Sequence, residues 1–591
     1  MSRAAPDPQS NMGNPEPRLD GRLKVTGEAR YGSDFAVANP AYAFLVTSPI
    51  AKGRIESMDL RAAKAVPGVL EIFNYENTGE LKDIKYAKGG GGPTSSIQGF
   101  GPQIQYGGQI VAMVVADTFE AAREAAHKVR VNYQSESPSA TFDSRGISQN
   151  AANEGLPQAG DAEQAYTTAD VRLETQYETP TQHHNPIELF TTTCVWRDNQ
   201  LTIYEPSQFV YGLKANAAKK IGVDLADIHA VSPFVGGGFG SKAQFSPRTG
   251  LVALAAKRLN RPVKLVATRD QGFTIQTYRA ETRHRIRIGA ERGGKITSFI
   301  HEGWEITSRP DPYSVSGVED SARLYGFGAV KTGVTLVHAD RNTPGFMRSP
   351  PVVPYIYALE SAMDELAVKL DVDPVELRRI NDSSTDATGK QWSSRSLMKC
   401  YSQAAERFGW ANRSAKPGTM RDGDWLIGWG CASAVYPTHV GVAAARVRLM
   451  ANGAALVQIA AHDLGTGAYT VIGQMAAESL GIPLSSVTVE LGDSELPPAP
   501  VAGGSNTTAS ACSAVMKACE AIRNKLTPVS ANRTTVGSAH GDRNKLDLED
   551  RFKTLGVGAI EEYAEYLPPG AKPDIFMPER RSLAEVPRAK S

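Results

Sequence analysis

Two hydrophobic patterns alternate along the chain and predict both strands and helices. Residues 110–115 form a short, continuous apolar run, which is typical of a buried strand. A helix is expected to follow from Asp117, because Asp117 and Glu120 have the spacing of a capping box. Apolar side chains recur at i, i+3 and i+4 in residues 358–370, which predicts an amphipathic helix, and a second helix is expected to begin at Asp373.

The sequence also carries a partial internal repeat. Residues 221–225 and 480–484 each contain a glycine shortly before an apolar run, which begins at Ile228 in one copy and at Val487 in the other. Each copy predicts a helix that ends at a C′ glycine and is followed by a strand. A glycine-bearing loop follows each strand, so two related α/β units that face one ligand are expected.

Changes in composition divide the chain of 591 residues into segments. Polar, proline-rich or charged stretches predict linkers and ends, and the patterned stretches between them predict folded units. The expected segments are a disordered lead-in (1–19), a first unit (20–135), a linker (136–165), a second unit (166–412), a third unit (413–530) and an irregular tail (531–591).

Composition excludes several classes of protein. Lys and Arg number 64 against 63 Asp and Glu, and this net charge of +1 gives no reason to expect a nucleic acid or an anionic membrane as partner. The apolar runs are shorter than the roughly 20 residues that span a bilayer, and the first residues lack the apolar core of a signal peptide. The five cysteines are scattered and include no C-x-x-C, so no disulfide framework and no cysteine-held zinc or iron–sulfur site is expected.

Three glycine loops are the strongest chemical signals. Residues 235–242 resemble a phosphate loop but do not match the Walker A pattern, because Ser241 stands between Gly240 and Lys242 where Gly-Lys-Ser/Thr is required. Two interpretations stay open: a backbone that approaches an anionic or oxo-bearing ligand, and a plain glycine-rich turn. Residues 463–470 place two glycines before a helix expected over 471–480, which suits a phosphate cradle or a simple strand–turn–helix connection. The third loop, residues 503–508, precedes a helix expected over 511–526. Three such loops favour a large polyanionic cofactor.

Two further motifs are considered as binding sites, and only the first remains a candidate. Arg348 lies in Gly-Phe-Met-Arg-Ser-Pro-Pro, where the prolines stiffen the loop, so it is either a fixed substrate or phosphate contact or an ordinary surface arginine. His183 and His184 are adjacent, and adjacent histidines of a strand do not converge on one ion, so no metal site is expected there.

Taken in order, these segments resemble the molybdenum-binding large subunit of the xanthine dehydrogenase/aldehyde oxidase family, closest to the bacterial aldehyde oxidoreductase type. The resemblance covers roughly residues 20–526. It rests on Asp20-Gly21 with Lys24–Gly27 and Tyr31, the Gly236–Lys242 loop with Ser241 for a glycine, Arg348, the helix around Met363–Ala367, Asp373-Pro374, Asp463–Thr470, Gln474, Leu480–Pro483 and Gly492-Asp493-Ser494.

The resemblance implies a fold and a cofactor. The fold would be a multidomain α+β and α/β protein, with an N-terminal α/β hammerhead domain followed by two related molybdopterin-binding α/β domains, the second incomplete. Molybdenum would be held by the dithiolene of a molybdopterin cytosine dinucleotide, with no protein ligand to the metal. By position, Gln208 and Arg348 resemble active-site residues. The positions that resemble cofactor contacts are Gly238, Phe239, Gly240, Gly465, Thr466, Gly467, Ser505 and Asn506.

One expected residue is not found. The family's general base is a Glu in a Gly-x-Gly-Glu motif, whereas residues 556–558 are followed by Ala559. Glu561, two residues further on, is interpreted as a decoy. The sequence is therefore expected to be a C-terminally truncated subunit with impaired activity.

The implied reaction is hydroxylation of an aldehyde or N-heterocycle by attack of a Mo–OH group with hydride transfer to Mo=S. Iron–sulfur clusters and FAD are expected on the partner subunits of a heterotrimer, and a separate C-terminal fragment is a candidate partner. The expected location is the cytoplasm, or the periplasm if the chain is exported with a partner. Two alternatives stay open: an inactive cofactor-binding or assembly protein of the same fold, and an unrelated nucleotide-binding protein.

Overall fold

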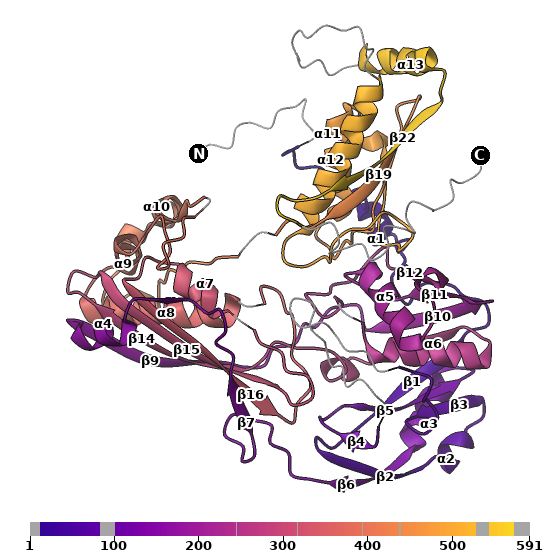
Figure 1. Ribbon diagram of the computed structural model, residues 1–591, viewed down its shortest axis with the longest axis horizontal. Helices are drawn as coiled ribbons and strands as arrows, with labels where there is room; N and C mark the ends of the chain where they lie inside the picture. Colours follow the sequence, from indigo (N-terminus) through magenta and orange to yellow (C-terminus); the bar gives the residue numbers. More distant parts are fainter. Residues whose placement is uncertain are drawn as a thin grey trace.

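The computed structural model describes residues 12–82, 101–243, 245–315, 317–350, 352–392, 394–436, 439–526 and 543–571. Three bodies of sheet and helix are seen in Figure 1: one built on a seven-stranded sheet, one built on a long six-stranded sheet, and a smaller C-terminal unit with a four-stranded sheet. Most of the expected irregular tail and the first eleven residues lie outside the described residues.

The largest sheet is built by two segments that the sequence separates. Its seven strands run in the order β12 (Ile228–Val231), β11 (Gln200–Tyr204), β10 (Thr191–Arg197), β13 (Val263–Val266), β1 (Ala41–Thr47), β5 (Ile110–Ala116) and β3 (Val69–Asn74). Strands β1 and β13 pair in parallel, with Ala41 opposite Val263, so the expected first and second units share one sheet. β5 confirms the strand expected over 110–115, and its side chains from Val111 to Ala116 are buried.

Helices cover this sheet and a small sheet lies beside it. α5 (Val210–Ile221) and α6 (Pro247–Leu259) bury apolar side chains in the same core as β10–β13, whereas α2 (Arg61–Lys64) and α3 (Phe119–Lys128) pack at the β1–β5–β3 end. The small sheet consists of β4 (Gln103–Ile104), β2 (Gly53–Asp59) and β6 (Arg130–Ser135). The predicted cap of α3 was wrong: the side chain of Thr118 accepts the Ala121 N–H, because it is the hydroxyl directly before the helix.

The second sheet contains the two longest strands. Its members are β7 (Ser148–Ala151), β16 (Ala329–Ala339), β15 (Ile296–Ser308), β14 (Thr282–Ala290) and β9 (Val171–Thr179), with β8 (Gln158–Ala159) also paired to β16. The packed helices are α4 (Ala162–Thr168), α7 (Val318–Arg323), α8 (Val352–Leu370) and α9 (Pro374–Ile380). The prediction of a linker over 136–165 is corrected here: β7 and β8 pair with β16, and α4 packs against the same sheet.

The third sheet has the strand order β21 (Val487–Glu490), β20 (Ala455–Gln458), β19 (Ala443–Met450) and β22 (Ala559–Tyr566). α11 (Ala468–Leu480), α12 (Thr507–Leu526) and α13 (Arg543–Leu555) pack against it. β22 corrects the prediction of an irregular tail: it pairs with the whole of β19, and Phe552 and Ile560 are buried in the core.

The predicted repeat is confirmed in its geometry. α5 ends at Gly222 and α11 ends at Gly481, both in the left-handed conformation, and each is followed by one 3₁₀ turn (η1, Leu225–Asp227; η4, Leu484–Ser486) and a strand. The two strands, β12 and β21, each lead toward a glycine loop. The sequence therefore located two related α/β units correctly at this level.

Helix starts differ from the predictions more than helix ends. α8, α11 and α12 each begin earlier than expected, at Val352, Ala468 and Thr507. The start of α9 was predicted correctly: the Asp373 side chain accepts the N–H groups of Val375 and Glu376. The early starts reflect tertiary packing, which continues a helix through residues that lack a periodic apolar signal.

The N-terminal lead-in also differs from expectation where it is described. The expected lead-in is anchored, because the Leu19 N–H donates to Oγ1 of Thr470 at 3.0 Å and Gln474 donates to the Asn14 carbonyl at 3.3 Å. The short helix α1 (Gly21–Val25) follows directly.

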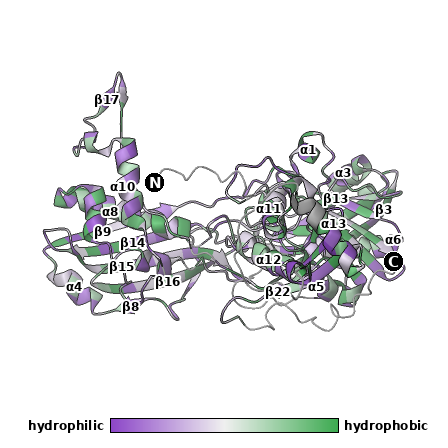
Figure 2. Cartoon of the chain, turned by 90° about the horizontal axis from the view of Figure 1, so that it is seen from above, coloured by the Kyte–Doolittle hydropathy of each residue, from purple (hydrophilic) through white to green (hydrophobic). Residues whose placement is uncertain are grey.

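One feature projects from the body. α10 (Leu397–Phe408) and the hairpin of β17 (Arg421–Asp422) and β18 (Trp425–Leu426) extend away from the second sheet (Figure 2). Within the described ranges, no helix combines the length and the apolar character that crossing a bilayer requires.

Candidate functional site

The glycine loop 235–242 is supported from below by a buried ion pair. Nζ of Lys242 lies 2.8 Å from Oε2 of Glu188, and both side chains are almost fully buried. The same carboxylate accepts the Gly236 N–H at 2.8 Å and the Gly32 N–H at 3.0 Å. Burial lowers the pKa of Lys242 to about 8, and the nearby Glu188 limits this shift. At neutral pH the ion pair is therefore formed, and it fixes the loop backbone.

Gln208 joins this loop to the third glycine loop. Its Oε1 accepts the Gly240 N–H at 3.0 Å, and its Nε2 donates to the Ala502 carbonyl at 2.7 Å. The Ala502 N–H returns a bond to the Gln208 carbonyl at 2.8 Å. A Cβ on Gly238 would lie 2.4 Å from Gln208 Oε1, so only glycine allows this approach. The buried amide of Gln208 thus positions two loops that belong to different units.

The second glycine loop meets the first from the other side. The Val235 N–H donates to the Asp463 carbonyl at 3.3 Å, and the hydroxyl of Tyr469 donates to the Pro233 carbonyl at 2.9 Å. All three predicted loops therefore converge, although they come from two separate sheets. This convergence makes them one site.

Arg348 is carried by a loop that packs on Phe239 and Gly240. The Arg348 N–H donates to the Phe239 carbonyl at 2.7 Å, and a Cβ on Gly240 would lie 2.3 Å from the Phe346 carbonyl oxygen. Phe239 has a positive φ of 56° and is 41% exposed, which is unusual for an aromatic side chain. Arg348 is exposed as well. An exposed aromatic ring and a cation thus flank the same backbone.

A buried arginine that the sequence did not reveal holds this loop. Arg279 is 4% exposed, and its guanidinium donates to four successive carbonyls, those of Met347, Arg348, Ser349 and Pro350, at 2.7–3.3 Å. His184 adds a further contact, with Nε2 at 2.6 Å from the Phe346 carbonyl. Burial lowers the pKa of His184 to about 4, so the neutral ring donates this bond at pH 7. His184 therefore serves the loop.

The start of α11 presents backbone donors beside a cation. Gly465 and Gly467 both have positive φ, and Gly467 caps the helix. The first turn of a helix leaves N–H groups without helical partners and attracts negative charge. The Arg18 guanidinium lies 3.3 Å from the position that a Cβ on Gly467 would take, and the backbone of Gly465 and Thr466 is exposed. This is an anion-binding arrangement.

The hydroxyls near this helix start differ in their availability. Thr466 is exposed, whereas Oγ1 of Thr470 is occupied by the Leu19 N–H. Below the loop, the buried carboxylate of Asp463 accepts the Gly465 N–H at 2.6 Å and lies 3.6 Å from Lys24, which also pairs with Asp20. The lead-in and α1 therefore brace the second loop.

The third loop leads into α12 through Ser505 and Asn506. Ser505 is exposed with a positive φ of 56°, and Oδ1 of Asn506 is buried without a hydrogen-bond partner in the described residues. A buried acceptor of this kind costs free energy unless a ligand supplies a donor. The three loops and their neighbours together offer backbone donors, an acceptor without a partner and two cations, which fits an anionic ligand that also carries a hydrogen-bond donor.

Residues that sequence reasoning missed are three supports: Glu188, Arg279 and Arg18. They lie outside glycine motifs, and only their burial and partners identify them. The decoy Glu561 lies on β22, where it is 51% exposed on its side chain and 3.9 Å from Arg446. Its role as a decoy, the roles of Gln208 and Arg348, and the cofactor contacts remain predictions.

Comparison with known proteins places this site in a family. Residues 26–137 match the aldehyde oxidase and xanthine dehydrogenase a/b hammerhead domain. Residues 146–382 and 403–565 each match a molybdopterin cofactor-binding domain.

Individual proteins agree with these matches. The aldehyde oxidoreductase molybdenum-binding subunit PaoC of Escherichia coli (strain K12) is 37% identical over 518 residues, which cover 87% of this chain and 70% of PaoC. The putative xanthine dehydrogenase molybdenum-binding subunit XdhA of the same strain is 29% identical and covers 80% of this chain and 66% of its own. The aldehyde oxidoreductase from Desulfovibrio desulfuricans ATCC 27774 has the same fold, with a TM-score of 0.78 and 21% identity over 95% of this chain and 64% of that chain.

The class defined by fold and site is a molybdopterin-binding protein with a hammerhead domain and two cofactor-binding domains. The chain belongs to the xanthine dehydrogenase/aldehyde oxidase family, as a molybdenum-binding large subunit. This membership excludes the unrelated nucleotide-binding protein. The chain spans 64–70% of the PaoC subunit and of the D. desulfuricans enzyme.

Proposed function

We propose that the chain is the molybdenum-binding subunit of a hydroxylase that oxidises aldehydes or N-heterocycles, with molybdenum held by a molybdopterin cytosine dinucleotide. The observation that carries this proposal is the convergence of the three glycine loops. The bond between Gln208 and Ala502 joins the first loop to the third, and the bond between Val235 and Asp463 joins the first loop to the second. When bound, such a cofactor supplies the two-electron oxidation and the route for the oxygen atom.

The residues of the chain would bind the cofactor and orient the substrate. The starts of α11 and α12 would hold the phosphates and the nucleotide, because their free N–H groups favour negative charge and Arg18 adds a cation. The backbone of Gly238, Phe239 and Gly240 would approach the metal end of the cofactor, held in place by its close packing against Gln208 and Phe346. Phe239 and Arg348 would line the substrate position, where the exposed guanidinium can orient a carbonyl or carboxylate group.

The proposal includes partner subunits. The electrons from a two-electron oxidation must leave the site, and this sequence has no C-x-x-C motif that would hold an iron–sulfur cluster. PaoC and XdhA are named as molybdenum-binding subunits, which supports partners that carry the clusters and FAD.

The decisive measurement is cofactor content. We expect close to one molybdenum and one cytosine nucleotide per chain, released together on acid denaturation. A folded chain without either, produced in cells that make the cofactor, would contradict the proposal. Molybdenum without turnover of any aldehyde or N-heterocycle by the assembled subunits would favour the inactive or assembly protein of the same fold.

Substitution separates the roles of the site residues. Arg348→Ala should lower dye-linked turnover at least about tenfold without changing the molybdenum content. The control Arg292→Ala, at an exposed turn between β14 and β15, should leave turnover unchanged. Glu561→Gln should have no effect. Loss of turnover in Glu561→Gln alone would identify Glu561 as the base and would overturn its interpretation as a decoy.

A further inference from the structure

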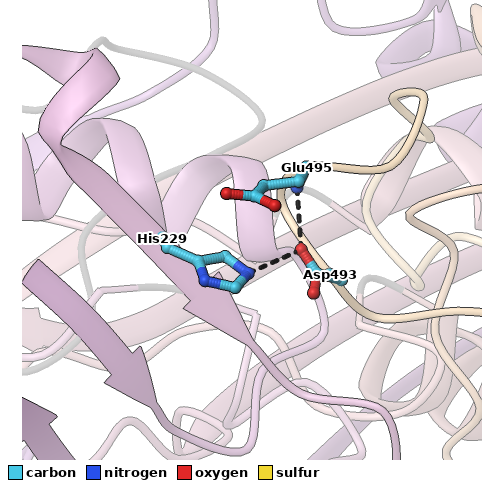
Figure 3. A group of neighbouring side chains, drawn as sticks. All are labelled: His229, Asp493 and Glu495. Atoms are coloured by element: carbon cyan, nitrogen blue, oxygen red, sulfur yellow. Dashed lines mark hydrogen bonds and ion pairs between the residues drawn. The ribbon is translucent and has the colours of Figure 1, made fainter. Parts of the chain in front are cut away.

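A second cluster of ligand-type side chains lies outside the glycine loops. His229 is on β12, and Asp493 and Glu495 follow β21, so the cluster joins the second cofactor-binding unit to the first (Figure 3). Nε2 of His229 lies 2.8 Å from Oδ1 of Asp493. One ligand atom from each of the three side chains lies within 4.8 Å of the other two.

The backbone around the cluster is held rigidly. Ser494 exchanges bonds with Ala230, through its N–H at 3.0 Å and its Oγ at 2.9 Å, and the Ser232 N–H donates to the Gly492 carbonyl at 2.6 Å. Val231 and Asp493 form a β-bridge. Gly492 has a φ of +72°, and a Cβ there would lie 2.1 Å from the Ser232 carbonyl oxygen, so this junction requires glycine. The ligand side chains therefore project from a preformed frame.

Two of the three side chains are already oriented toward each other. Oδ1 of Asp493 also accepts the Glu495 N–H at 2.8 Å, which fixes the carboxylate. The side chains of His229 and Asp493 are 31% exposed and Glu495 is exposed, so an ion can enter from solvent. Ligands of a tetrahedral ion at about 2.0–2.2 Å are roughly 3.4 Å apart, so the ring and the carboxylate need to separate by only a small side-chain rotation.

The donor set selects the class of ion. We propose that His229, Asp493 and Glu495 bind a divalent transition-metal ion of the zinc type, which clamps the two cofactor-binding units together. One imidazole and two carboxylates suit zinc, whereas Ca²⁺ and Mg²⁺ prefer oxygen ligands alone. The charge of Lys214 acts on His229 and would repel a cation bound there, but the two carboxylates outweigh this single positive charge. Water completes the coordination.

The position of the ion gives it a structural consequence. β12 runs from His229 directly toward Val235, the first residue of the glycine loop, and Asp493 belongs to the unit that carries the other two loops. An ion here would restrain the relative position of the two halves of the cofactor site. The inference does not depend on the proposed activity, because its ligands are separate from the loop residues.

The test measures binding of Zn²⁺ alone to the purified full chain after treatment with a chelator. Competition with a chromophoric chelator gives the stoichiometry and affinity, and Co²⁺ as a substitute gives a visible spectrum that reports tetrahedral nitrogen and oxygen ligands. Glu495→Gln is the principal variant, since Glu495 is exposed and the change keeps the His229–Asp493 contact. His229→Gln is the second. His127→Gln, at an exposed position on α3, is the matched control.

We expect one Zn²⁺ per chain, an affinity at least about tenfold weaker in Glu495→Gln and weaker still in His229→Gln, and no change in His127→Gln. Binding of Zn²⁺ should also raise the thermal midpoint of the wild-type chain but not that of His229→Gln. The proposal is overturned if the chain binds no stoichiometric Zn²⁺, or if a folded Glu495→Gln variant binds it as tightly as the wild type.

Discussion

Glu188 and Lys242 show how single buried charges shape the site. Their ion pair lies below the first glycine loop, and the same carboxylate also accepts the N–H groups of Gly236 and Gly32. Breaking one side of a buried pair is costly because it leaves the other charge without a partner. The conformation of the loop thus depends on two residues that contact no predicted ligand.

Glu188→Gln is expected to destabilise the loop by about 3–5 kcal/mol, since it leaves the Lys242 ammonium buried and unpaired. The double variant Glu188→Gln with Lys242→Met removes the charge and should recover most of this loss. Hydrogen exchange of the amides in residues 235–242 measures the free energy of local opening for each variant. If the single variant opens no more readily than the double variant, the ion pair does not support the loop.

At the scale of elements, the proposed contacts with the cofactor lie at helix starts. α11 begins at Ala468 and is capped by Gly467, a left-handed residue next to the Arg18 guanidinium, and the preceding residues Gly465 and Thr466 are exposed. A negative charge placed here would compete with a phosphate for the same donors.

Gly467→Asp and Gly467→Asn form a matched pair for this helix start. Both side chains tolerate the left-handed conformation better than most, and they are close in size but differ in charge. We expect the Asp variant to retain the nucleotide cofactor at least about fivefold less well than the Asn variant, which corresponds to a repulsion of about 1 kcal/mol in water. Cytosine nucleotide per folded chain after dialysis gives the measurement. Equal retention in the two variants would exclude an anion at this helix.

At the scale of the whole molecule, contacts between units set the geometry. His462 of the third unit is buried, and its Nε2 accepts the Val210 N–H at the start of α5. Burial lowers the pKa of His462 to about 3, that of His284 to about 3 and that of His184 to about 4. All three rings are neutral in the folded protein at pH 7.

These histidines predict a loss of stability in acid. Below pH 6.5 the unfolded chain binds protons at these rings, whereas the folded chain does not until about pH 4 or 3, so the unfolded state is favoured as the pH falls. Each ring contributes roughly 1.4 kcal/mol per pH unit in this window. His462→Gln, which keeps an acceptor for the Val210 N–H, should reduce the pH dependence of unfolding by one proton between pH 6 and 4.5. An unchanged dependence, equal to that of the exposed control His127→Gln, would contradict this account.

Local signals in the sequence determined much of this protein. The glycines at 222 and 481, the Asp373 cap and the apolar run of β5 were predicted correctly, because each depends on residues within one turn or strand. The three glycine loops were found for the same reason. The order of the motifs also identified the family, which the comparisons confirmed.

Tertiary structure decided how these parts meet. Gln208 bonds to Ala502 across 294 residues and His229 to Asp493 across 264, and no local pattern encodes either contact. The shared seven-stranded sheet and the strands in the expected linker and tail arise because exposed strand edges gain hydrogen bonds from distant segments. The supports Glu188 and Arg279 became visible only through burial, since a charged residue has a fixed partner only after the fold has excluded water.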